Sequence, residues 1–154
     1  MRISYAQDAR LLELASQRLS VSLRGDATTI SAWSDDGAEL FGVVVFNNFA
    51  HPNVELSIWT RSPKWCSRRF LRACFEYAFR QCGCHRCSIL VRTTNEKMIE
   101  TARRLGFVRE GLVREACDDG ADAVLFGMLR RDCAWLTHKR TSDGQKNPKR
   151  SPAA

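Results

Sequence analysis

The sequence has no long hydrophobic run. Its longest apolar stretch, residues 40–46, is far too short to span a lipid bilayer. The first twenty residues carry polar side chains every few positions, so they lack the apolar segment of a secretory signal. We therefore expect a cytoplasmic protein that does not enter a membrane.

The cysteines form neither a disulfide framework nor a complete zinc motif. Seven is an odd number, and without a secretion signal the thiols should stay reduced. Cys82, Cys84 and Cys87, with His85 between them, are metal-ligand types, but no second pair at zinc-knuckle spacing accompanies them. They span a predicted helix end and strand start, where small apolar side chains fill a core. We predict no bound metal, with zinc at this cluster as the alternative.

Excess positive charge is scarce outside the C-terminal tail. The net charge is +7, and residues 137–154, with five Lys or Arg and one Asp, contribute +4 of it. This tail has no apolar periodicity and is rich in Lys, Ser, Pro and Gly, which predicts disorder. Residues 1–136 are long enough for one domain with a real core. We expect nucleic acid to be bound weakly through the tail, if at all.

A strand–helix–strand unit occupies the middle of the chain. Residues 54–60 alternate apolar and polar side chains, as in a half-buried strand. Apolar residues then recur every three or four positions from 70 to 82, which indicates an amphipathic helix over about 66–82. Gly83 follows, where a helix ends at low cost in the left-handed conformation. A second apolar strand over 87–93 makes a βαβ crossover with parallel strands.

The start of this helix is a candidate phosphate site. Unpaired amides and the helix dipole favour an anion there, and Lys64, Arg68 and Arg69 gather at the same end. The alternative is a basic helix start that is merely solvated.

The flanking segments predict a mixed sheet. We expect a helix over 8–19, strands over 28–33, 39–49 and 54–60, and, after the crossover and a further helix from residue 95 to 105, a hairpin of 107–116 with 122–129. No internal repeat is visible. The predicted class is α/β.

The end of the crossover resembles the GNAT superfamily of N-acetyltransferases. In that family an Asn opens a helix, LGF closes it and xxEGxxR forms the next strand; here these are Asn95, residues 105–107 and VREGLVRE. EYAFRQCGCHRCSILVRTTN and DAVLFGMLRRDCAWL are similar to the branch with ribosomal-protein N-terminal acetyltransferases, especially its short, often phage-borne members. The resemblance covers residues 28–135. It implies a mostly antiparallel sheet with a central parallel βαβ crossover, splayed fourth and fifth strands, and acetyl-CoA in the gap.

The resemblance also implies where the cofactor binds. The pantetheine arm would lie along the strand 56–60, the pyrophosphate in the loop and helix start over 62–69, and the next helix would contribute Asn95 and its neighbours. The candidates are Ile58, Trp59, Thr60, Lys64, Trp65, Cys66, Ser67, Arg68, Arg69, Asn95, Met98 and Thr101.

The pyrophosphate loop departs from the family pattern Q/R-x-x-G-x-G/A. Trp65 stands at the first Gly and Ser67 at the Gly/Ala position. Glycine is wanted there because the backbone must approach the phosphates closely. Either the nearby Lys and Arg side chains replace the lost amides, or the pocket is degenerate.

Two residues are candidate bases for the reaction that the resemblance implies, a direct attack of an amine on a thioester. Glu55 falls on the fourth strand, where related enzymes carry a glutamate that acts directly or through water; its alternative is an exposed polar residue. His51 precedes that strand, and its alternative is an idle loop histidine. The family's acid, a tyrosine four residues before the Gly of LGF, is replaced by Ala102.

The Asn95 side chain also has two possible roles. It either orients the cofactor or caps the helix that follows. A capping box of Thr93 with Glu96 would leave Asn95 free for the ligand.

We therefore predict an acetyl-CoA-dependent N-acetyltransferase that acts on a small-molecule amine or a protein N-terminus. A GNAT-fold protein that binds acyl-CoA or a partner without turnover is the alternative, and a nucleic-acid-binding module is a third hypothesis. The patterns leave the acceptor amine and the oligomeric state open.

Overall fold

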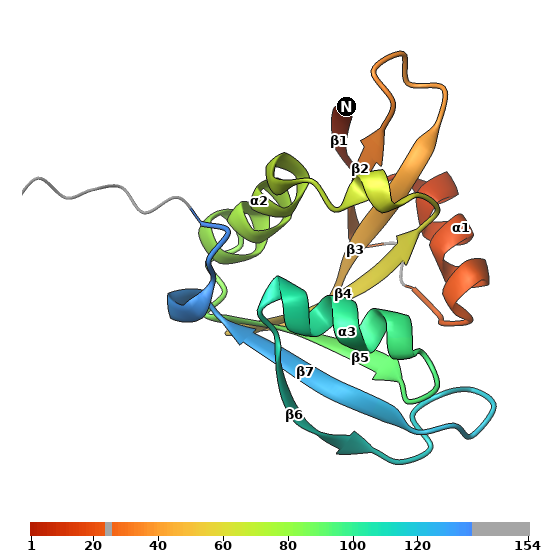
Figure 1. Cartoon of the computed structure of the whole chain (residues 1–154), viewed down its shortest axis with the longest axis vertical. Helices are drawn as coiled ribbons and strands as arrows, with labels where there is room; N and C mark the ends of the chain where they lie inside the picture. The colour runs from red at the N-terminus through yellow and green to blue at the C-terminus, as the bar shows by residue number, and fades with distance from the viewer. Residues whose placement is uncertain (24–25, 137–154) are drawn as a thin grey trace, which may run out of the picture.

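The structure, a computed structural model, describes residues 1–23 and 26–136 as one seven-stranded sheet with three α-helices (Figure 1). The predicted tail over 137–154 lies outside the described residues. In chain order the elements are β1 (Arg2–Ala6), α1 (Ala9–Leu19), β2 (Thr28–Trp33), β3 (Leu40–Ala50), β4 (Asn53–Thr60), the 3₁₀ turn η1 (Pro63–Trp65), α2 (Arg68–Glu76), the π-helical turn η2 (Tyr77–Gln81), β5 (Arg86–Arg92), α3 (Glu96–Leu105), β6 (Val108–Val113), β7 (Ala123–Leu129) and the 3₁₀ turn η3 (Arg130–Asp132).

The sheet has the order β1-β2-β3-β4-β5-β7-β6, and among the described strands only β4 and β5 pair in parallel. This confirms the α/β class, the parallel crossover and the late hairpin. The edge strand β1 was not predicted. Its sequence alternates polar and apolar residues only from Arg2 to Tyr5, a run at the lower limit of length for a strand signal.

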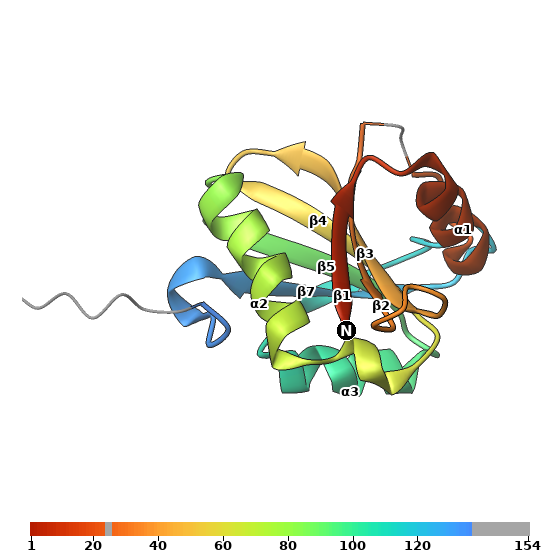
Figure 2. The same cartoon turned by 90° about the horizontal axis from the view of Figure 1, so that it is seen from above.

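Two cores lie on opposite faces of the sheet. Val44 and Phe46 of β3 point into the larger core, with the apolar faces of α2 and α3. Val43 and Val45, which alternate with them, point into a smaller core against α1. Figures 1 and 2 show α1 on the far side of the sheet from α2.

The crossover helix has the predicted apolar face and begins two residues later than expected. Ser67 is its N-cap, and its side chain accepts a hydrogen bond from the N–H of Phe70. Phe70, Cys74 and Phe79 are buried in the larger core. After the π-helical turn, Gly83 has a φ of +67°, the left-handed conformation predicted for it.

The strands β4 and β5 separate soon after they meet. They pair through three positions only, Asn53–Arg86, Val54–Cys87 and Glu55–Ser88. Beyond Glu55, β4 continues to Thr60 with no described strand on its β5 side, and β5 turns to pair with β7. The predicted splay of the fourth and fifth strands is therefore confirmed. No described helix is long and apolar enough to cross a membrane.

Candidate active site

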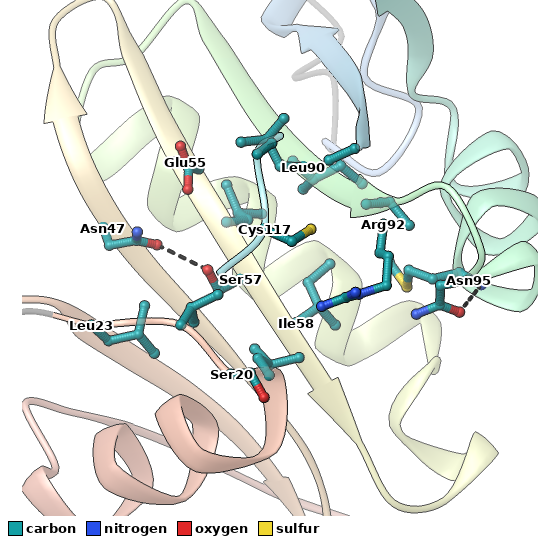
Figure 3. A pocket seen from close by; sticks show the side chains of 18 of the residues that line it. Ser20, Leu23, Asn47, Glu55, Ser57, Ile58, Leu90, Arg92, Asn95 and Cys117 are labelled. Carbon is teal, nitrogen blue, oxygen red and sulfur yellow. Dashed lines mark hydrogen bonds between the residues drawn. The ribbon is translucent and has the colours of Figure 1, made fainter. Parts of the chain in front are cut away.

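A cleft of about 490 Å³ opens where β4 and β5 separate (Figure 3). Leu56 and Ile58 line it from the side of the sheet that packs on α2 and α3, whereas Glu55 and Ser57 line it from the side of α1. Because successive residues of one strand point to opposite faces, the cleft passes through the sheet. A ligand bound from one face can therefore meet a second ligand bound from the other.

Glu55 lies in the most polar part of this cleft. Glu55 lies opposite Asn47 of β3 on one side and opposite Ser88 of β5 on the other. Both of these residues are buried. The Ser57 hydroxyl donates to Asn47 Oδ1 at 3.4 Å, as Figure 3 shows. Four hydrogen-bonding side chains thus gather on the α1 side of the cleft floor, in a sheet that is otherwise largely apolar.

Asn53 adds an unused acceptor to this polar group. Its Nδ2 donates to Ser88 Oγ at 3.1 Å, and its Oδ1 is buried with no hydrogen-bond partner among the described residues. An unsatisfied buried oxygen costs free energy, so a water or a ligand donor would be bound favourably there.

The free edge of β4 suits an extended ligand. From Leu56 to Thr60 its β5 side lacks a strand partner in the described part of the chain, and Ile58 lines the cleft directly. Backbone N–H and C=O groups on such an edge can bind an extended chain as an added strand. This is the place predicted for the pantetheine arm.

Trp65 does not reach the predicted pyrophosphate site with its side chain. The indole is only 5% exposed and packs in the larger core against Phe70, with ring centroids 6.2 Å apart. The backbone N–H of Trp65 donates to Ser62 O at 3.2 Å, and the next two backbone amides, of Cys66 and Ser67, also donate to carbonyls within this turn. The loop therefore offers no amide cradle of the kind that a glycine-rich loop provides.

The remaining donors at this end come from the start of α2. The N–H groups of Arg68 and Arg69, the first two of the helix, have no backbone partner among the described residues. Lys64 and Arg68 are exposed, and the Lys64 ammonium lies 5.2 Å from the centre of the Phe41 ring. Side-chain charge and two helix amides fit a diphosphate here, in place of the loop amides.

Two further features constrain this end. Arg69 Nη1 donates to the carbonyl of Met1 at 3.2 Å, so the first residue of the chain lies against the helix start. Cys66 is exposed overall at the same turn, but partial desolvation of its thiol raises the pKa of that group. The neutral thiol can contact a phosphate only as a weak donor.

Asn95 caps α3, so the capping box of Thr93 with Glu96 is not what opens this helix. Asn95 Oδ1 accepts from the N–H of Met98 at 3.1 Å. Its amide nitrogen stays available at the edge of the cleft, which both Asn95 and Met98 line (Figure 3). Thr101 does not line the cleft, and its hydroxyl donates to Lys97 O at 2.8 Å within the helix.

The structure does not bring His51 to the cleft. It is exposed at the end of β4 where the strands pair, and its ring centroid lies 5.7 Å from that of His85. Thr60 and Trp59, which were also predicted to contact the cofactor, do not line the cleft; Trp59 packs partly against the smaller core. Of the two candidate bases, Glu55 alone lines the cleft.

The sequence did not identify the residues that form two walls of the cleft. One is the segment after α1, including Ser20 and Leu23, and the other is the connection between β6 and β7, with Cys117. Arg92 projects between them and donates to Asp119 Oδ2 at 2.5 Å. This hydrogen bond and the nearby charge lower the pKa of Asp119 and raise that of Arg92, so both groups stay ionised. No local pattern marks these residues, because they meet only through the fold.

The cysteine cluster lies elsewhere. Cys84 and Cys87 are buried in the larger core, and burial raises the pKa of both thiols. Within residues 1–23 and 26–136, no three His, Cys, Asp or Glu side chains are placed to hold a metal ion.

Comparisons with known proteins agree with this geometry. The chain is similar over most of its length to solved acetyltransferases: a chimera of the spermidine N-acetyltransferase SpeG from Vibrio cholerae and hSSAT (15% identity, 84% of this chain and 96% of that one, TM-score 0.62), and a putative acetyltransferase from T. thermophilus (23%, 71% and 62%, 0.60). The V. cholerae enzyme in complex with CoA and spermine is a third (19%, 78% and 73%, 0.58). At these identities the likeness shows the fold.

No curated protein matches the sequence. A family model described as an acetyltransferase (GNAT) domain matches residues 6–108, from the last residue of β1 to the first of β6. The matched stretch contains β4, α2, β5 and α3, which build the cleft. The chain belongs to the GNAT acetyltransferase family, whose acyl donor is acetyl-CoA.

Proposed function

We propose that the protein transfers an acetyl group from acetyl-CoA directly to an amine, which is a small molecule or a protein N-terminus. The observation that carries this proposal is the cleft through the sheet, with a free strand edge on one side and Glu55 on the other. Acetyl-CoA supplies the activated thioester. The amine nitrogen bonds to the carbonyl carbon, the carbon–sulfur bond breaks, and the amine loses a proton.

In this proposal Glu55 takes the proton from the attacking amine, directly or through a water. Asn47, Ser57 and Ser88 surround it with donors and acceptors that can hold such a water in place. No tyrosine stands where the family has its acid: Ala102 is fully buried in the core. The departing thiolate is then protonated by water that enters the open cleft.

The acceptor enters from the side of α1. Two of the solved relatives are named for spermidine, and one of them holds spermine. In this chain the cleft walls carry Arg18 and Arg92 beside Glu55 and Asp118, so the two charge signs are balanced. A monoamine or a protein N-terminus, as in the branch that the sequence resembles, fits this balance better than a polyamine does.

A second candidate is a protein that binds acyl-CoA without turnover. The internally bonded loop around Trp65 and the buried Ala102 favour it. Location in the reducing cytoplasm is a further part of the proposal, supported by seven free cysteines.

The test is release of free thiol from acetyl-CoA in the presence of an amine panel: monoamines, spermidine and peptides with a free N-terminus. We expect Glu55→Gln to lower kcat/KM by about 100-fold, the usual size of a general-base contribution, with acetyl-CoA affinity unchanged. Glu39→Gln, on an exposed turn, is the matched control. Tight binding of acetyl-CoA with no thiol release from any amine would instead establish the non-catalytic candidate.

A further inference from the structure

A second cavity, of about 460 Å³, lies at the start of β5 and the end of β7, at the opposite end of both strands from the cleft. Its lining residues are Arg80, His85, Leu129, Arg130, Arg131 and Leu136, and none of them lines the cleft. Three are arginines, and His85 adds an imidazole that can donate a hydrogen bond. No carboxylate of residues 1–23 and 26–136 lines the cavity. It is therefore a concave site of positive charge, separate from the cleft.

The polar side chains reach the cavity from three segments that are far apart in sequence. Arg80 belongs to η2, His85 precedes β5, and Arg130 and Arg131 belong to η3. Like charges repel one another when the fold brings them together. A bound anion would offset this repulsion, so the arrangement favours a negatively charged ligand.

The backbone that carries these side chains is held by hydrogen bonds. The N–H of Arg130 donates to His85 O at 2.8 Å, and the N–H of His85 donates to Pro52 O at 3.0 Å. After η3, Trp135 Nε1 donates to Leu105 O at 2.7 Å. Figures 1 and 2 show this segment, in blue, beside α2. Because the segments are already fixed relative to one another, less entropy is lost when they bind a ligand.

Two of the arginines have no counter-ion within the described residues. Arg130 and Arg131 are exposed and form no ion pair there. Arg80 differs, because its Nη1 lies 3.1 Å from Glu76 Oε1. Asp132 follows the two arginines in sequence, but it does not line the cavity. At least two positive charges are thus available to a ligand.

We propose that this cavity binds a ligand with two or more linked phosphate groups, chiefly through Arg130 and Arg131. The planar guanidinium group donates two parallel hydrogen bonds to phosphate oxygens, so neighbouring arginines suit linked phosphates. A volume of about 460 Å³ is ordinary for a small-molecule site. No Phe, Tyr or Trp of the described residues lines the cavity, so it lacks a ring on which a nucleobase could stack. The phosphate groups, free or at the end of a nucleotide, are therefore what it recognises.

This site is distinct from the start of α2, where the pyrophosphate of acetyl-CoA is predicted. That position lies beside Lys64 and Arg68, whereas Arg80 follows α2 at its other end. At the rise of a helix, Arg68 and Arg80 are roughly 15–20 Å apart along the axis. One compact diphosphate cannot contact both positions.

The test is calorimetric titration of the full chain with pyrophosphate at about 50 mM salt, where screening is modest. We expect Arg130→Ala/Arg131→Ala to lower the affinity about 10-fold or more, because it removes several charge-assisted hydrogen bonds. Arg10→Ala/Arg114→Ala removes the same charge from exposed positions elsewhere and should lower the affinity less than about twofold. Citrate, which carries a similar charge on carboxylates, should bind more weakly than pyrophosphate.

Two backgrounds separate this cavity from other positive charges of the chain. Lys64→Ala/Arg68→Ala weakens the predicted cofactor site, and a second variant carries Gln at the five Lys and Arg positions of residues 137–154. In both backgrounds the loss caused by Arg130→Ala/Arg131→Ala should persist. Uridine diphosphate distinguishes the two sources of phosphate: binding at least as tight as that of pyrophosphate indicates a nucleotide, and weaker binding indicates an inorganic polyphosphate.

The proposal is wrong if pyrophosphate does not bind, or if the loss in Arg130→Ala/Arg131→Ala equals that in Arg10→Ala/Arg114→Ala. It is also wrong if the loss disappears in either background, or if citrate binds as tightly as pyrophosphate. None of these results depends on acetyltransferase activity.

Discussion

Trp65 shows at the scale of one residue how this chain departs from its family. The family pattern has a glycine there, and this protein has a buried indole that belongs to the core. We expect Trp65→Ala to lower the free energy of unfolding by about 3–5 kcal/mol, the usual cost of truncating a buried aromatic side chain. Urea denaturation measures it, with the exposed neighbour Lys64→Ala as the control.

A loss below about 1 kcal/mol would show that the indole packs less tightly than the structure has it, because surface changes usually cost about that little. The sequence showed that Trp65 breaks the loop pattern, but not where its ring goes. Trp65 approaches Gly42 on β3 closely: a Cβ on Gly42 would lie 3.0 Å from Trp65 Cβ. Such a relation between residues far apart in sequence has no local signature.

At the scale of elements, the N-cap of α3, Asn95, can be tested for a second role in binding the cofactor. We expect Asn95→Asp to keep the stability of the wild type, because Asp caps helices as well as Asn does. It should bind acetyl-CoA severalfold more weakly, since it lacks the amide donor and adds a negative charge near the ligand. Asn95→Ala should lose about 1 kcal/mol of stability as well. Thermal unfolding and calorimetric titration separate the two effects.

If Asn95→Asp binds acetyl-CoA as tightly as the wild type, Asn95 is a helix cap and does not bind the cofactor.

Most elements were predictable because each carries its own pattern: α1 has Asp8 as its cap and buried Leu11 and Leu12, and α3 ends at Gly106 with a φ of +100°. The strand β1 was not, because its alternation of polar and apolar residues spans only Arg2 to Tyr5, and its pairing with β2 arises from the fold. His51 was misplaced as a candidate base for a related reason: nearness in sequence to β4 does not say at which end of the strand a cleft opens.

At the scale of the whole molecule, the sheet consists of two parts, β1 to β4 and β5 to β7, joined by three residue pairs. The splay was expected from the family resemblance, but the walls of the cleft depend on loops that only the complete fold brings together. A ligand that lies along β4 and also contacts α3 connects both parts. It should therefore stabilise the molecule as a unit.

At acetyl-CoA concentrations about 100-fold above Kd, binding adds about 2.7 kcal/mol. For a chain of this size we expect Tm to rise by roughly 5–10 °C. Hydrogen exchange should slow at the amides of residues 56–60, because the arm would cover the free edge of β4, and should change little on β6, which is remote from the cleft. Adenosine 3′,5′-bisphosphate, which lacks the arm, is the matched ligand: it should leave the amides of 56–60 unprotected. Equal protection by both ligands, or none by acetyl-CoA, would place the arm somewhere other than the gap between the two parts of the sheet.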